Sequence, residues 1–160
     1  MTSRVYSQGY QPTLDEFKQH IRITTNDMDA DLTLKLKASI RSAEHYIGQI
    51  IAKSVFVYTD VFAKTVILEG PVIEVSGVKV DGVSISSDKW ELKGEVLTID
   101  AEGDTLEVTY SAGMVVVDDD IKAAILLHAA ALFNNPIDTV ETLPKASSRL
   151  LDPYRTWGVA

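Results

Sequence analysis

The hydrophobic periodicity of this 160-residue chain changes twice, and this change restricts the fold more than any other feature. Apolar residues recur at steps of three and four from Leu32 to Ile50, which is the spacing of one helix face. From Ser54 the apolar runs are short, β-branched and of period two, as in strands, and helical spacing returns after Asp118. The element order is therefore helical, then β, then helical again, which indicates an α+β fold.

Start signals in the sequence place the helices. Thr13 and Glu16 have the spacing of a capping box, which predicts a short helix over Leu14–His20. Aspartates open both of the long helical segments, where negative charge complements unpaired backbone N–H groups. We expect these helices over about Asp29–Ile51 and Asp119–Phe133, and the second should be the most buried because apolar residues surround it. A shorter helix is expected near the C-terminus.

Between the helical parts, β-branched runs alternate with turn residues. Asp81-Gly82 separates two such runs and predicts a tight hairpin, because both turn positions need positive φ. Other glycines mark the remaining turns. The expected strands are Ser54–Phe62, Lys64–Leu68, Val72–Val80, Val83–Ile85, Trp90–Leu92, Glu95–Ile99 and Thr105–Tyr110.

These elements predict an α+β fold that is mainly a helical bundle of three to four helices. An antiparallel β insertion, at about residues 54–113, lies between the second and third long helical parts. Residues 13–155 are expected to form a single domain. An extended N-terminal arm over residues 1–12 precedes it, and a C-terminal tail over residues 156–160 follows it.

Charge and composition exclude several function classes. A net charge of −8 and a pI near 4.8 argue against nucleic-acid binding, because an acidic surface repels phosphate backbones. The chain has no cysteine, which removes disulfides, thiolate nucleophiles and cysteine metal sites. No apolar run reaches the ~18 residues of a membrane span, and the N-terminus has no signal-peptide pattern. These features predict a cytoplasmic protein with no membrane contact.

The residues that could bind metal or catalyse a reaction do not form a motif. His20, His45 and His128 have no second histidine or glutamate at the spacing of a metal-binding pair. Asp27–Asp31 resembles the first half of a calcium loop but lacks the glycine and glutamate that complete one. Asp118–Asp120 is better explained by favourable charge at a helix N-terminus. We therefore expect no catalytic, cofactor or metal site and no enzyme activity.

Several stretches carry motifs in a fixed order along nearly the whole chain. They are Leu14–Arg22, Asp27–Asp31, Ala43–Ile47, Gly70–Val75, Val108–Gly113, Val117–Leu126, Leu143–Pro144 and Leu150–Arg155. With the β insertion between them, these stretches resemble the head–tail connector (adaptor) proteins of tailed bacteriophages and prophages. Asp118 stands where that family usually has a proline.

The resemblance implies a structural protein of virion assembly and DNA packaging, without chemistry. It implies a ring homo-oligomer that binds the portal protein and the tail completion proteins, while DNA passes through without sequence-specific binding. It places the chain at the head–tail junction of the virion, and in the bacterial host cytoplasm during assembly. Two other function classes stay open. They are a small cytoplasmic metal-dependent hydrolase that uses the acidic clusters, and a monomeric protein-binding module that uses the β unit.

The candidate interface residues are Tyr154, Arg155 and Trp157. They follow Pro153, which ends the last helix, and these residue types are frequent interface anchors because each brings large area or a planar hydrogen-bonding group. They either fold back on their own helices or dock on a neighbouring subunit or the portal, and the sequence leaves both possibilities open.

Overall fold

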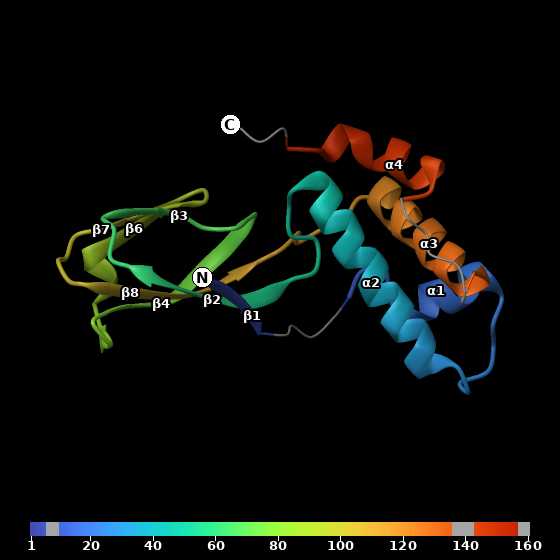
Figure 1. Cartoon of the computed structure of the whole chain (residues 1–160), viewed down its shortest axis with the longest axis horizontal. Coiled ribbons are helices and arrows are strands. Elements are labelled where there is room, and N and C mark those ends of the chain that lie inside the picture. The colour runs from blue at the N-terminus through green and yellow to red at the C-terminus, as the bar shows by residue number, and fades with distance from the viewer. Residues whose placement is uncertain (6–9, 136–142, 157–160) are drawn as a thin grey trace. The chain divides into compact units, whose positions relative to one another are not determined.

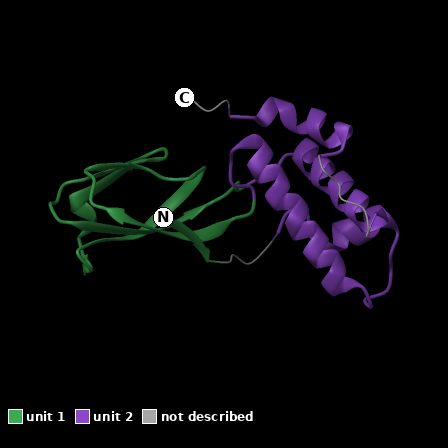
Figure 2. Ribbon diagram, viewed as in Figure 1, with its two compact units in different colours: residues 1–8, 52–115 green, residues 9–51, 116–160 purple. Residues whose placement is uncertain are grey.

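The computed structural model describes residues 1–5, 10–135 and 143–156. These residues contain four α-helices and eight β-strands. The chain divides into two compact units, shown in different colours in Figure 2. Unit 1 consists of residues 1–8 and 52–115, and unit 2 consists of residues 9–51 and 116–160.

Unit 1 contains the eight described strands in two antiparallel sheets (Figure 1). The order is β1-β2-β8-β4-β5 in the five-stranded sheet and β3-β7-β6 in the three-stranded sheet, which lies over one face of the larger one. A 3₁₀ turn, η1 (Ser87–Lys89), precedes β6. The strands are β1 (Thr2–Val5), β2 (Ser54–Val61), β3 (Thr65–Ile67), β4 (Val72–Val80), β5 (Val83–Ser84), β6 (Trp90–Lys93), β7 (Val96–Ile99) and β8 (Thr105–Ala112).

The core of unit 1 lies between the two sheets. Successive residues of a strand point to opposite faces, and on β8 every second residue from Leu106 onward is buried. On β7, Leu97 and Ile99 are buried in the same way. The rings of Phe56 and Tyr110 stack within this core, with their centroids 5.4 Å apart. The β unit therefore has a hydrophobic core of its own.

The predicted Asp81-Gly82 hairpin is confirmed between β4 and β5. Both turn residues have positive φ, 49° at Asp81 and 77° at Gly82. The Asp81 carboxylate also accepts hydrogen bonds from the backbone N–H groups of Thr105 and Asp104, at 2.8 and 2.9 Å, where β8 begins. These bonds, the one from Thr105 first, favour the ionised carboxylate and hold the pKa of Asp81 below its ordinary value.

The first residues of the predicted N-terminal arm form an edge strand. β1 pairs antiparallel with β2 over its four residues. The Arg4 guanidinium donates a hydrogen bond from Nε to Ser54 Oγ at 2.8 Å and lies 5.6 Å from the centroid of the Phe56 ring. The assignment of residues 13–155 to a single domain stays a prediction.

Unit 2 contains four helices, α1 (Leu14–Ile21), α2 (Asp29–Ile47), α3 (Asp119–Asn134) and α4 (Lys145–Leu151), followed by a 3₁₀ turn, η2 (Asp152–Tyr154). The capping box is confirmed, because Thr13 Oγ1 accepts from Glu16 N at 3.2 Å and the Glu16 carboxylate accepts from Thr13 N at 2.7 Å. Helix α2 ends before the predicted Ile51, because Gly48 adopts a φ of 73° and closes it. No helix in the described residues combines the length and apolar character that crossing a bilayer requires.

The core of unit 2 is formed by one face of each helix. Helix α3 contributes Ile121, Ala124, Ile125 and Ala129, each at most 1% exposed. It is not enclosed all round as predicted, since its other apolar side chains are only half-buried. The buried residues of the other elements in this core are Phe17, Leu32, Leu36, Ile40, Ala43, Ile47 and Leu151.

The prediction that the fold is mainly a helical bundle is wrong. The described residues contain four helices and eight strands in two antiparallel sheets; 39% of them are helical, with the 3₁₀ turns included, and 29% are in strands. The sequence was interpreted as one β insertion on a bundle, whereas the strands form two layers and enclose their own core. Residues 2–5 also add a strand that short polar composition did not reveal.

Replacing Ile125 with aspartate tests the core of unit 2. Ile125 is completely buried, so the substitution places an unpaired charge among apolar groups and should lower the free energy of unfolding by roughly 4 kcal/mol. The control is Leu34→Asp, at an exposed position of α2, which should change the free energy of unfolding by less than about 1 kcal/mol. Denaturant unfolding measures both, and equal effects would contradict the assigned core.

The lowered pKa of Asp81 predicts a pH-dependent effect of Asp81→Asn. In the unfolded chain an aspartate titrates near about 3.9, and in the folded chain Asp81 titrates lower. The stabilisation is therefore complete above that unfolded value and is lost as pH falls through the folded pKa. We expect the melting temperature of the variant to be lower than that of the parent at pH 7, and we expect this difference in melting temperature to shrink below about pH 4. A difference that stays constant from pH 7 to pH 2.5 would contradict this role.

Candidate functional site at the C-terminal segment

The C-terminal segment Asp152–Thr156 lies against the end of α2. Thr156 donates to the Ile47 carbonyl oxygen from its backbone N–H at 2.8 Å and from Oγ1 at 2.9 Å. Gln49 Nε2 donates to the Tyr154 carbonyl oxygen at 3.0 Å. The last carbonyl groups of a helix have no partner within it, so Thr156 satisfies one of them and fixes the segment in place.

Tyr46 holds the same segment through its side chain. Its hydroxyl donates to Asp152 Oδ1 at 2.5 Å, and this hydrogen bond is the main cause that raises the pKa of Tyr46. The Arg155 guanidinium lies 4.8 Å from the centroid of the Tyr46 ring, a cation–π geometry. Tyr46 belongs to the Ala43–Ile47 motif, one of the stretches that carry the resemblance to connector proteins. The sequence did not indicate its contact with the C-terminal segment.

Tyr154 and Arg155, two of the three candidate interface residues, are half-buried within their own unit. Burial, followed by a hydrogen bond to Asp118 at the start of α3, raises the pKa of Tyr154. The side chain therefore links the end of the chain to the N-terminus of α3. Trp157 lies outside the described residues. A role of these residues at an interface stays a prediction.

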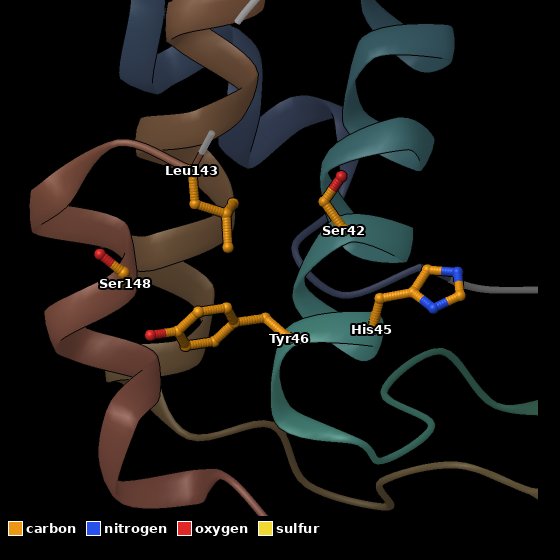
Figure 3. Close-up of a pocket in the computed structure, with 5 residues that line it drawn as sticks. All are labelled: Ser42, His45, Tyr46, Leu143 and Ser148. Atoms are coloured by element: carbon orange, nitrogen blue, oxygen red, sulfur yellow. The ribbon is translucent and has the colours of Figure 1, made fainter. Parts of the chain in front are cut away.

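A groove of about 590 Å³ lies between α2 and α4 (Figure 3). In the figure, Tyr46 points from α2 toward α4 and Ser148. The described lining consists of Ser42, His45, Tyr46, Leu143 and Ser148, and it has hydroxyl and imidazole groups but no carboxylate. Sequence reasoning missed this groove, because its residues come from segments about 100 positions apart.

The acidic residues of the sequence do not gather into a metal site. Asp29 forms an ion pair with the nearly buried Lys18 at 2.8 Å, and Asp31 pairs with Lys35 at 2.5 Å. Asp118 occupies the N-cap position of α3 without making a side-chain cap bond. Over residues 1–5, 10–135 and 143–156, no group of three histidine or acidic side chains could hold a metal ion.

The three histidines lie apart. His20 and His45 are exposed on α1 and α2, and His128 is buried on α3. Burial lowers the pKa of His128, so the imidazole is neutral at pH 7, and its Nδ1 has no hydrogen-bond partner among the described residues. His128 therefore serves as a core side chain of unit 2.

The comparisons with known proteins indicate the class of protein to which the chain is similar. The family model described as "Phage gp6-like head-tail connector protein" matches residues 11–88. The resemblance to the head–tail connector proteins stated from the sequence is thereby confirmed over residues 11–88. No curated protein sequence matches the chain significantly.

The fold of the whole chain is shared with solved structures of gene transfer agent (GTA) particles. A chain of the "Neck of empty GTA particle computed with C6 symmetry" has a TM-score of 0.80 at 20% identity. A chain of the "Virion of native gene transfer agent (GTA) particle" has a TM-score of 0.78 at 21% identity, and one of the "Neck of native GTA particle computed with C12 symmetry" has 0.78 at 19%. Each comparison covers 100% of this chain and 97% of the other. The family match and the shared fold together support a structural role in virion assembly.

Because Thr156 docks on α2 beside Gly48, we predict that substitutions at Gly48 and Thr156 have non-additive effects on the free energy of unfolding. A Cβ at Gly48 would lie 2.6 Å from Thr156 Oγ1, and the φ of 73° adds strain of roughly 1–2 kcal/mol for any other residue. Gly48→Ala should therefore destabilise less in a Thr156→Ala background than in the parent. Denaturant unfolding of the double-mutant cycle measures this difference.

Gly82→Ala is the matched control for this cycle. Gly82 has a φ of 77° but no atom within 4 Å of its Cβ position, so its cost should be the same in both backgrounds. Additive effects of Gly48→Ala and Thr156→Ala would show that the C-terminal segment does not dock on α2 in solution.

Proposed function

We propose that this chain is one subunit of a closed ring at the head–tail junction of a virion. The ring seats on the portal, receives the tail completion proteins and gives DNA a passage through its centre. The chain does no chemistry in this role, and its surfaces perform the function. During assembly it is present in the cytoplasm of the bacterial host.

The observation that carries this proposal is the fold match over the whole chain. The related structures are described as necks of GTA particles, computed with C6 and C12 symmetry. A protein at such a position occurs in several identical copies about one axis. Closed rings form through heterologous interfaces, in which two different patches of one subunit meet head to tail. The match thus favours a ring for this chain as well.

The charge of the chain suits a passage for DNA. A net charge of −8 per copy repels phosphate groups, so a genome would slide past the ring without sequence-specific binding. In the described residues the three aspartates before and within the first turn of α3 are exposed, as are Asp27 and Asp31 on either side of the start of α2. We propose that some of these aspartates face the passage.

The C-terminal segment is the proposed anchor on a neighbouring subunit or on the portal. Its described part is fixed to α2 through Thr156, and this contact sets the direction in which the chain leaves unit 2. The Tyr154 and Arg155 side chains are partly exposed, and Trp157 follows directly in the sequence. Aromatic and arginine side chains that keep a fixed position lose little entropy on binding, which suits an anchor.

Removal of residues 157–160 tests this anchor while leaving every described contact intact. We expect the truncated chain to unfold at nearly the same temperature as the parent. It should fail to form rings on purified portal, because Trp157 is missing. Native mass spectrometry and electron microscopy of portal mixed with either chain measure ring formation, and Leu34→Ala serves as a surface control.

Two outcomes would contradict separate parts of the proposal. Rings of the truncated chain at normal efficiency would show that the anchor lies elsewhere. A full-length chain that forms no ring, either when concentrated or with portal present, would refute the proposed function itself.

A further inference from the structure

Strand β2 presents an apolar stripe on the outer face of the five-stranded sheet, where a solvated face is normally polar. A sheet with one face in water alternates apolar inward residues with polar outward ones. On β2, however, three of the four outward residues are valines, Val55, Val57 and Val61. Val5 of β1 lies directly opposite Val55, and these two side chains are 55% and 37% exposed. We call these four residues the valine face.

The three-stranded sheet has a second apolar patch on its own outer face. Ile67 of β3 lies directly opposite Val96 of β7. Their side chains are 76% and 39% exposed, although an isoleucine normally lies inside. Thr65 and Thr98 form the next cross-strand pair and carry no charge. We call Ile67 and Val96 the isoleucine face.

The two faces lie on opposite sides of unit 1. The inner faces of the two sheets enclose the core, so the outer faces point away from each other (Figure 1). A head-to-tail contact requires two different patches that point in different directions. The two described sheets supply this arrangement within one compact β unit.

The charges beside the two faces are complementary. Lys53, two residues before Val55, is exposed and forms no ion pair among the described residues. Glu107, opposite Thr59 on the same face, is paired with Lys79 at 2.8 Å, and Glu74 lies one strand farther from Val55, across β8. Beside the isoleucine face, Lys93 is neutralised by Glu91 at 3.2 Å. Glu69 and Glu95 are exposed there and form no ion pair within the described part of the chain. A cation beside one face and two carboxylates beside the other favour contact between them.

We propose that the valine face of one copy packs on the isoleucine face of the next copy in the ring. This inference rests on the proposed function and names the surfaces that would close the ring. The three strands of the smaller sheet have only three or four residues each, so they present roughly 200 Å² of surface, about a quarter of what one partner buries in a stable complex. The contact alone is therefore weak, which suits subunits that assemble only on a portal.

Engineered cysteines test the contact directly, because the chain has none of its own. The double variant Val55→Cys with Ile67→Cys should give a ladder of disulfide-linked multimers when it is oxidised after assembly on portal. Either single variant should stay monomeric on a non-reducing gel. Equimolar mixing of the two single variants should give covalent dimers and nothing larger.

The control is Val55→Cys with Leu34→Cys, which pairs the valine face with an exposed residue of α2 in unit 2. The proposed contact is overturned if the variant Val55→Cys with Ile67→Cys gives no ladder, or a ladder no stronger than that of the control. If rings are still seen by electron microscopy in that case, the proposed function stands and only the assignment of surfaces fails. Self-linked dimers of a single variant would instead show a symmetric contact and also overturn the proposal.

A charge substitution provides a second measurement. Val55→Glu places a like charge against Glu69 and Glu95 of the next copy, whereas Val55→Lys places an opposite one. We expect the glutamate variant to form rings about tenfold less efficiently than the lysine variant, with equal unfolding temperatures. Equal ring formation by the two variants would contradict the proposed complementarity.

Discussion

The pairing of β2 with β8 is the interaction on which the rest of the structure depends. β2 begins where the chain leaves unit 2 and β8 ends where it returns, and Ser54 lies directly opposite Ala112. The intervening residues can therefore fold as a separate β unit while α2 and α3 share one helical core. Gly113 completes this junction, because its φ of 137° and a Cβ position 2.6 Å from Lys53 Cα exclude any other residue without a shift of backbone.

Local patterns in the sequence predicted the elements well, and the arrangement of those elements less well. The capping box at Thr13 and the Asp81-Gly82 hairpin depend on neighbouring residues alone, and both are confirmed. The early end of α2 at Gly48 depends on a positive φ that the apolar period hides. The two-layer sheet and the pairing of β1 depend on contacts across about 50 residues, which no local period encodes, so the fold was wrongly expected to be mainly helical.

The candidate site shows the same division. Aromatic residues and arginine after the last helix indicated Tyr154 and Arg155, but their contacts with Asp118 and Tyr46 join segments that are distant in the chain. The predicted position of the acidic clusters at helix starts is confirmed, because Asp29 and Asp31 lie in the first turn of α2 and Asp119 and Asp120 in that of α3, although Asp118 makes no side-chain cap bond. The sequence did not predict the apolar patches on the outer faces of the two sheets. β-branched residues favour strands on either face, so their presence does not show which of them point outward.

The proposed function therefore depends on the surfaces that the chain presents to other subunits and to DNA. Each unit has its own core, and what remains outside is an acidic surface, a fixed C-terminal segment and an apolar patch on the outer face of each sheet. The most direct test is electron cryo-microscopy of particles assembled with this chain as the only connector protein. We predict density for the chain as a closed ring of identical copies between head and tail. Mature particles that lack the chain, or that hold it as isolated copies away from this junction, would contradict the proposed role.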